Sequence, residues 1–214
     1  MQILRYNIRM DKYILDTNLF FNMGSGLNMG RDTETVVKNI TQLIKKNKTI
    51  GSVIFFMPPC IIDEFLSFFE NKNQSFINDF LSQITIKSPD YHKININGTI
   101  FYDLIEDVRN RNYRGLTISE EEISSAGELM MGKQKTDKRG FQTTIGPVIK
   151  KFRERYRQAT RLGFLDSVAD LDLIMLAKEQ DGFLVSSDEG VLKWGRRFGV
   201  KETPASIFAS KLNN

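Results

Sequence analysis

Residues 166–177 read DSVADLDLIMLA and place three carboxylates, Asp166, Asp170 and Asp172, at the head of an otherwise apolar run. The pattern predicts a helix that is largely buried. Asp166 and Asp170 are four residues apart, so both project from the same face of that helix. Negative charge directed toward an interior is costly unless something neutralises it. The stretch therefore predicts a polar site at the edge of a core rather than an ordinary surface helix.

The sequence around this stretch alternates between strand-like and helix-like patterns. Runs typical of buried parallel strands lie at 12–16, 49–57, 84–88 and 182–187. VKET at 200–203 predicts a further short strand. Helical periodicity lies between them, at 33–47, after Pro59, at 76–84, after Asp188 and near the end of the chain. Strands and helices that alternate with short connections predict an α/β fold, with a parallel sheet flanked by helices.

Residues 98–163 carry helical periodicity without strands. Apolar stripes at 101–108, 118–130 and 145–159 predict three helices, and 131–140 predicts a loop. This region separates the third predicted strand from the acidic helix. We therefore expect an α/β domain made of residues 11–97 and 164–212, interrupted by an inserted helical subdomain at 98–163.

The composition excludes several kinds of protein and of chemistry. Among 214 residues, 41% are hydrophobic and 26% are charged, which is typical of a soluble globular protein. No apolar stretch reaches the roughly 20 residues that span a bilayer, so we expect a cytoplasmic protein without a membrane partner. The single cysteine, Cys60, can form neither an internal disulfide nor a CxxC site, and the single histidine, His92, excludes multi-histidine zinc sites. Any catalysis is expected to depend on carboxylates.

Several carboxylates lie where a parallel sheet binds its ligands, beyond the carboxyl ends of the strands. Asp16 ends the first predicted strand and Asp188 follows the fourth, LVSS. If these strands are neighbours, both side chains converge with Asp166 and Asp170. Like charges that close raise one another's pKa, and a hard divalent cation resolves the conflict. Oxygen ligands without His or Cys favour Mg²⁺ or Mn²⁺ over zinc.

Each carboxylate also has an ordinary structural interpretation. Asp16 can simply end a strand, Asp166 can cap a helix that begins at Ser167, and Asp188 can cap the next helix. Asp172 lies about 200° around the helix from Asp170, so it is not expected to share a metal with it directly. Asp172 can equally support the site or form a hydrogen bond that ties the helix to a neighbouring element. Either role fits its position as well as metal ligation does.

Short motifs resemble those of PIN-domain nucleases. They are LDTN (15–18), Glu64 after the Pro58-Pro59 pair, Asp170 with its following apolar residues, and LVSSDEG (184–190). Longer stretches are similar to one PIN family, the RNA-free ribonuclease P or HARP family, formerly known as RNA ligase partner. They are FYDLIEDVRNR (101–111), KFRERYRQATRLGFLDSVADLDLIMLA (151–177) and SSDEGVLKW (186–194). The acidic pattern D-S-x-x-D-x-D of that family is present in full at 166–172.

The resemblance implies a PIN-like fold and an endoribonuclease that uses Mg²⁺ or Mn²⁺ to remove 5′ leaders from precursor tRNA. It also implies a large homo-oligomer, paired through the helical insertion. Catalytic roles fall on Asp16, Asp166, Asp170, Asp172 and Asp188. The expected metal ligands are Asp16, Asp166, Asp170 and Asp188. Supporting positions are Thr17, Glu64 and Ser186, where the two hydroxyl groups orient carboxylates or a bound water.

Positive charge is concentrated in the inserted region. Residues 131–161 contain ten Lys or Arg against Asp137 and Glu154, a local charge of +8 in a chain of net charge +4, which leaves −4 elsewhere. Such a stripe favours contact with RNA phosphates, although a solvated helix face can carry the same charge. The RNA-contact candidates are Lys150, Lys151, Arg153, Arg155, Arg157 and Arg161.

Three other functions fit parts of the sequence. A toxin-like PIN ribonuclease shares the acidic motifs, but a compact toxin has no need of the basic insertion. A phosphatase with Asp16 as nucleophile requires a second acid two residues later, where Asn18 stands. A non-catalytic RNA-binding partner can lose its acidic residues, whereas this chain keeps every acidic position of the family pattern.

Overall fold

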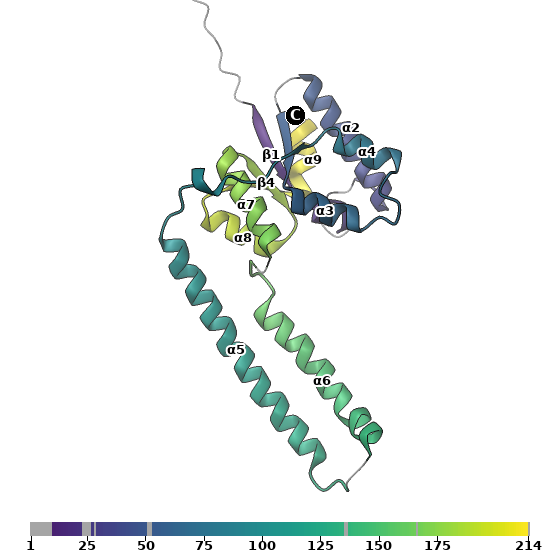
Figure 1. Ribbon diagram of the computed structural model, residues 1–214, viewed down its shortest axis with the longest axis vertical. Coiled ribbons are helices and arrows are strands. Elements are labelled where there is room, and N and C mark those ends of the chain that lie inside the picture. The colour runs from purple at the N-terminus through teal and green to yellow at the C-terminus, as the bar shows by residue number, and fades with distance from the viewer. Residues whose placement is uncertain are drawn as a thin grey trace, which may run out of the picture. The chain divides into compact units, whose positions relative to one another are not determined.

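The computed structural model describes residues 10–22, 27, 29–50, 53–134, 137–165 and 167–213 (Figure 1). They divide into two compact units. The sheet unit comprises the described residues up to Ile96 and from Leu165 onward, and the hairpin unit comprises residues 97–164. Asp166, a predicted ligand, lies outside the described residues.

Five parallel strands form the sheet, in the order β3-β2-β1-β4-β5. They are β1 (Asp11–Leu15), β2 (Val53–Met57), β3 (Thr85–Ile86), β4 (Phe183–Ser186) and β5 (Lys201–Pro204). β1 pairs with both β2 and β4, and Leu15 lies opposite Val185. The strands that precede Asp16 and Asp188 are therefore neighbours, and the predicted α/β fold with a parallel sheet is confirmed.

Helices flank this sheet (Figure 1). They are α1 (Asn18–Phe21), α2 (Thr33–Ile50), α3 (Pro59–Ser67), α4 (Ser75–Leu81), α7 (Val168–Gln180), α8 (Glu189–Arg197) and α9 (Ala205–Asn213), with a short 3₁₀ turn, η1 (Tyr91–Lys93). α7 packs against β1 and α8, while α2 packs against β2 and α9. The rings of Tyr13, Phe55 and Phe183 stack across three neighbouring strands. Tyr13 and Phe55 are buried and Phe183 is half-buried, and this aromatic row packs along the strands that carry Asp16.

Two boundaries in the sheet unit differ from the sequence prediction. Thr49 and Ile50 end helix α2 and do not begin a strand, and β2 starts at Val53. The Thr49 hydroxyl donates to the Lys45 carbonyl, and Asn47 donates to the Leu43 carbonyl. Each side chain is thus bonded within the helix. The β-branched pair Thr49 and Ile50 favoured a strand in the sequence prediction because such residues are common in strands.

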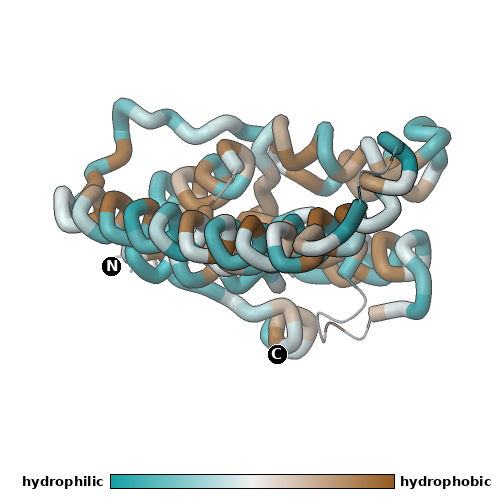
Figure 2. The backbone as a smooth tube through the Cα atoms, turned by 90° about the horizontal axis from the view of Figure 1, so that it is seen from below, coloured by the Kyte–Doolittle hydropathy of each residue, from teal (hydrophilic) through white to brown (hydrophobic). Residues whose placement is uncertain are grey.

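The hairpin unit consists of two long helices, α5 (Thr99–Met130) and α6 (Lys138–Thr160), along which polar and apolar residues alternate (Figure 2). The prediction of two separate helices within 99–130 was wrong. Gly115 lies inside α5, and a Cβ there would stand 2.9 Å from a ring carbon of Tyr156, so this glycine allows close packing of α6. The predicted loop at 131–140 is shorter than expected, because Asp137 caps α6 through a 2.8 Å bond from the Gly140 amide.

Arg111 joins the two helices from a buried position. Its guanidinium forms an ion pair with Asp107 and donates to the carbonyl oxygens of Thr160 and Leu162. Its charge is therefore satisfied within the hairpin. Across the described ranges, the hairpin helices included, no helix is both long and apolar enough to cross a membrane.

Candidate active site

Asp16 follows β1 directly and is only 2% exposed. Its Oδ1 accepts hydrogen bonds from the Asn18 amide and the Thr17 hydroxyl, both at 3.3 Å. Its Oδ2 accepts from the Ser186 hydroxyl at 2.5 Å and from Asn18 Nδ2 at 3.2 Å. Burial raises the pKa of Asp16, the bonds from Ser186 and Asn18 act to lower it, and the charge of Asp188 raises it further. The site is thus built around a buried carboxylate that the protein orients with four donors.

Ser186 connects Asp16 to Asp188. Its hydroxyl is fully buried, donates to Asp16 and accepts from the Asp188 amide at 2.9 Å. Asp188 caps α8, because its Oδ1 accepts from the amides of Gly190 (2.6 Å) and Val191 (3.0 Å). Among the described residues, none donates a hydrogen bond to its Oδ2. The capping interpretation of Asp188 therefore holds and leaves one oxygen of the same carboxylate for a ligand.

Glu64 lies on α3 and is affected by the charge of Asp16. Partial burial raises the pKa of Glu64, a hydrogen bond with Thr17 acts in the opposite direction, and the charge of Asp16 raises it further. Thr17 thus lies between two carboxylates, next to Asp16 in sequence and in contact with Glu64. The sequence signal for Glu64 was its place near the start of the helix that follows Pro58.

Asp170 occupies the first turn of α7 and is half-buried. The cap of this helix is Ser167, whose hydroxyl accepts from the Asp170 amide at 3.0 Å. The alternative in which Asp166 caps a helix that begins at Ser167 is therefore wrong. A carboxylate in the first turn is favoured by the partial positive charge of the helix N-terminus.

Asp172 forms hydrogen bonds with residues other than those around Asp16. Its Oδ1 accepts a short hydrogen bond from the Tyr91 hydroxyl, and its Oδ2 accepts from Cys60 Sγ at 3.3 Å. Burial, followed by the bond to Asp172, raises the pKa of the Cys60 thiol to about 11, and the same causes raise the pKa of Tyr91. Sequence reasoning missed Tyr91, because nothing in the local pattern relates it to a residue 81 positions later.

The donor set fits a hard divalent cation. Within the described ranges, no three His, Cys, Asp or Glu side chains form a group that could hold a metal ion as they stand. Asp16 and Asp188 nevertheless interact closely enough to affect the pKa of Asp16, and Asp16 acts likewise on Glu64. A buried carboxylate destabilised by like charges gains most from a cation, and oxygen ligands alone suit Mg²⁺ or Mn²⁺.

Comparison with known proteins identifies the family. The family described as PINc domain ribonuclease matches residues 12–214. The RNA-free ribonuclease P of Pyrococcus horikoshii is 36% identical over 204 residues, which cover 95% of this chain and 92% of the relative. The chain belongs to the RNA-free ribonuclease P family. Members from Hyperthermus butylicus (35% identical; 99% of this chain, 88% of the relative) and Nitrosococcus oceani (34%; 90% and 89%) match over similar lengths. The predicted family resemblance is confirmed.

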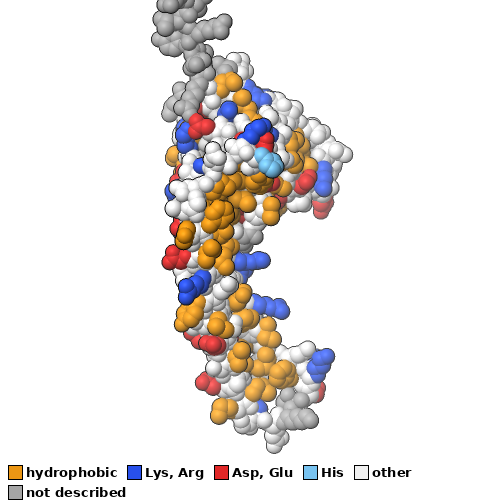
Figure 3. Space-filling view, turned by 60° about the vertical axis from the view of Figure 1, so that its left-hand side comes forward, with side chains coloured by type: hydrophobic (Ala, Val, Ile, Leu, Met, Phe, Trp, Pro, Cys, Tyr) orange, Lys and Arg blue, Asp and Glu red, His pale blue; other side chains and the backbone are white. Residues whose placement is uncertain are grey.

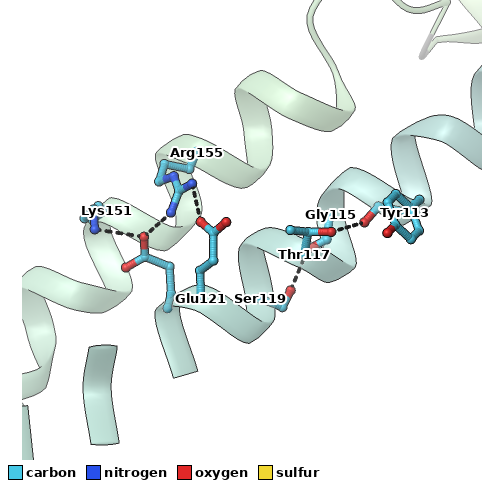
Figure 4. A network of polar contacts seen from close by, with 8 residues as sticks. Tyr113, Gly115, Thr117, Ser119, Glu121, Lys151 and Arg155 are labelled. Atoms are coloured by element: carbon cyan, nitrogen blue, oxygen red, sulfur yellow. Dashed lines mark hydrogen bonds and ion pairs between the residues drawn. The ribbon is translucent and has the colours of Figure 1, made fainter. Parts of the chain in front are cut away.

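The hairpin of this RNA-free ribonuclease P family member neutralises part of its own basic charge (Figure 4). Arg155 forms ion pairs with Glu121 and Glu122, both at 2.6 Å, and Lys151 contacts Glu122 at 3.0 Å. Glu122 is buried, with 4% of its side chain exposed. Two of the predicted RNA contacts therefore hold α5 and α6 together. The acidic run at 120–122 was visible in the sequence, but its pairing with α6 was not.

The other basic candidates are placed differently. Arg157 pairs with Glu154 on its own helix at 2.8 Å, and Arg161 is the C-cap that follows the last residue of α6. Lys150 and Arg153 are exposed and form no ion pair with any residue that the structure describes. Together with Arg157 they line one hollow along α6. Among the described residues, Lys150 and Arg153 are thus members of the predicted set that no carboxylate of the protein neutralises.

Proposed function

We propose that this protein is a metal-dependent endoribonuclease that removes the 5′ leader from precursor tRNA. The observation that carries the proposal is the bond from Ser186 to buried Asp16, because it joins two carboxylates at the ends of adjacent parallel strands. That arrangement occurs in a chain that belongs to the RNA-free ribonuclease P family. The curated relatives are named for this activity.

Mg²⁺ or Mn²⁺ is the cofactor that this site suits, and Asp16, Asp166, Asp170 and Asp188 are the residues that would hold it. Bound there, the cation supplies Lewis acidity and lowers the pKa of an attacking water. The protein itself orients the ligands: Ser186 and Asn18 fix both oxygens of Asp16, and the α8 N-terminus fixes Asp188. Hydrolysis of the bond to the leader 3′ oxygen leaves a 5′-phosphate on the tRNA.

The hairpin unit serves RNA contact and self-association in this proposal. Lys150 and Arg153 offer charges to RNA phosphates, which carry most of the affinity in such complexes. Hydrophobic side chains also gather on the surface of the hairpin (Figure 3). An exposed apolar surface of this kind marks an interface, so we infer a homo-oligomer formed through the hairpin.

The test is cleavage of a 5′-labelled precursor tRNA in Mg²⁺. We expect a single cut at the leader junction, lost by at least about a hundredfold in Asp16→Asn and in Asp188→Asn, and lost with EDTA. Asp63→Asn is the matched control, because Asp63 is exposed on α3 beside Glu64 and outside the acidic group. Scattered cuts would indicate a general PIN ribonuclease, and tight binding without cleavage would indicate an RNA-binding partner.

A further inference from the structure

Both carboxylate oxygens of Asp172 accept a hydrogen bond from another part of the protein. Tyr91 donates to one carboxylate oxygen and Cys60 to the other. Asp172 also lies two residues from Asp170, about 200° around α7, so the two side chains leave the helix on opposite sides. The third acid of the D-S-x-x-D-x-D pattern is therefore engaged by the protein and directed away from the side of Asp170.

A second contact holds the same face of α7. Glu179 lies seven residues after Asp172, which is two helical turns and about 10 Å along the axis. Its oxygens accept a short bond from Lys87 Nζ and a 3.0 Å bond from the Asp90 amide. Lys87, Asp90 and Tyr91 all belong to residues 87–93, which follow β3 and which we call the strap. The strap is thus hydrogen-bonded to α7 at two points, Glu179 and Asp172.

The Cys60 contact adds α3 to this arrangement. Cys60 and Glu64 are one turn apart on α3, so they lie on the same side of that helix. Asp172 therefore ties α7, which carries Asp170, to α3, which carries Glu64. A bond between the two helices at this point sets the relative placement of two acids of the candidate active site.

We propose that Tyr91, through Asp172, is a positioning residue that aims α7 so that Asp170 reaches the metal. Asp172 then acts as a holder of α7 and not as a ligand, and this inference rests on the proposed function. Packing alone gives a poor account of Tyr91, because the residue is 48% exposed while its hydroxyl donates to Asp172 on another element. Hydrogen bonds that orient a ligand contribute about 10–100-fold to metal affinity or activity.

The experiment measures Mn²⁺ binding by electron paramagnetic resonance without RNA, beside kcat and KM for precursor tRNA. Tyr91→Phe removes only the hydroxyl, and we expect about tenfold weaker Mn²⁺ binding, a similar loss in kcat and an unchanged KM. The matched control is Tyr102→Phe. Tyr102 is 79% exposed on α5, and its hydroxyl bonds to none of the residues that the structure describes. Wild-type Mn²⁺ affinity and wild-type kcat in Tyr91→Phe would overturn the proposal.

Two further variants separate positioning from ligation. If Tyr91 acts through Asp172, the double variant Tyr91→Phe, Asp172→Asn binds Mn²⁺ within about twofold of Asp172→Asn alone. Losses that multiply in the double variant would show that Asp172 acts independently, and would reject the proposal. Cys60→Ser, which keeps a donor, should retain Mn²⁺ affinity better than Cys60→Ala. Because Mn²⁺ binding needs no RNA, a failure here stays distinct from a failure of wild-type protein to cut the leader.

Discussion

The buried carboxylate of Asp16 lowers the stability of the folded protein when it is charged. Its pKa is raised chiefly by burial, so the folded state binds a proton more tightly than the unfolded chain does. A carboxyl with a raised folded pKa weakens the folded state once the pH exceeds its unfolded value, because the charged form is disfavoured inside. At neutral pH this residue therefore opposes folding until a cation joins it.

Asp16→Asn is accordingly expected to stabilise the metal-free protein while it abolishes cleavage. The substitution removes the charge, and the carboxamide oxygen, in place of Oδ1, still accepts from the Asn18 backbone amide. The new NH2 group, in place of Oδ2, can donate to the Ser186 hydroxyl once the Asn18 side chain turns its own oxygen toward it. We expect a gain of about 1 kcal/mol, or a Tm about 2–4 °C higher. Mg²⁺ should raise the Tm of the wild type and not that of the variant, since only the wild type binds it. A lower Tm in metal-free Asp16→Asn, with Asp63→Asn unchanged, would contradict this account.

The strap and α7 form a second level of organisation, that of packed elements. Glu179 has 11% of its side chain exposed and binds Lys87 and the Asp90 amide. Burial acts to raise the pKa of Glu179, but these two bonds outweigh it and the pKa lies below its usual value. The contact therefore stabilises the folded state fully above the unfolded pKa of Glu179, about 4.3, where the carboxyl is ionised. This stabilisation is lost as the pH falls through the lowered pKa of the folded state.

Glu179→Gln is expected to lower the free energy of unfolding by about 1–2 kcal/mol at pH 7. The difference from wild type should shrink as the pH falls below about 4, where the wild-type carboxyl takes up its proton. Urea denaturation at both pH values measures it. Glu70→Gln, at an exposed position, should match the wild type throughout. A loss of equal size at both pH values would assign the effect to packing.

Elements with a local pattern were predictable from the sequence, and contacts across long separations were not. The apolar runs predicted the strands, and Asp16 and Asp188 could be assigned to strand ends, where parallel sheets bind their ligands. That the two strands are neighbours was only a condition in the sequence prediction and comes from the pairing of β1 with β4. Gly115 reads locally as a break, yet packing against Tyr156 keeps α5 continuous. The bond between Tyr91 and Asp172 joins segments 81 residues apart, so no periodicity could indicate it.

At the scale of the whole molecule, the homo-oligomer proposed above can be tested on the exposed apolar side chains of the hairpin. Phe101, Ile105, Val108, Leu116 and Ile123 on α5 are all exposed, between 39% and 71%. They recur at intervals of four, three, eight and seven residues, which places them on one helical face. A contiguous apolar stripe in water favours association, and a second copy of the chain carries the same stripe.

Ile105→Glu combined with Ile123→Glu is therefore expected to reduce the mass of the particle in sedimentation velocity at micromolar concentration. Burying either glutamate in an apolar interface without a partner costs several kcal/mol, so the association should fail while the sheet unit keeps its fold. Asn110→Glu adds the same charge at an exposed position about 140° around α5 from Ile105, and should leave the mass unchanged. An unchanged mass in the double variant would exclude this face as the interface, whereas Mn²⁺ binding that survives dissociation would show that the metal site is complete within one chain.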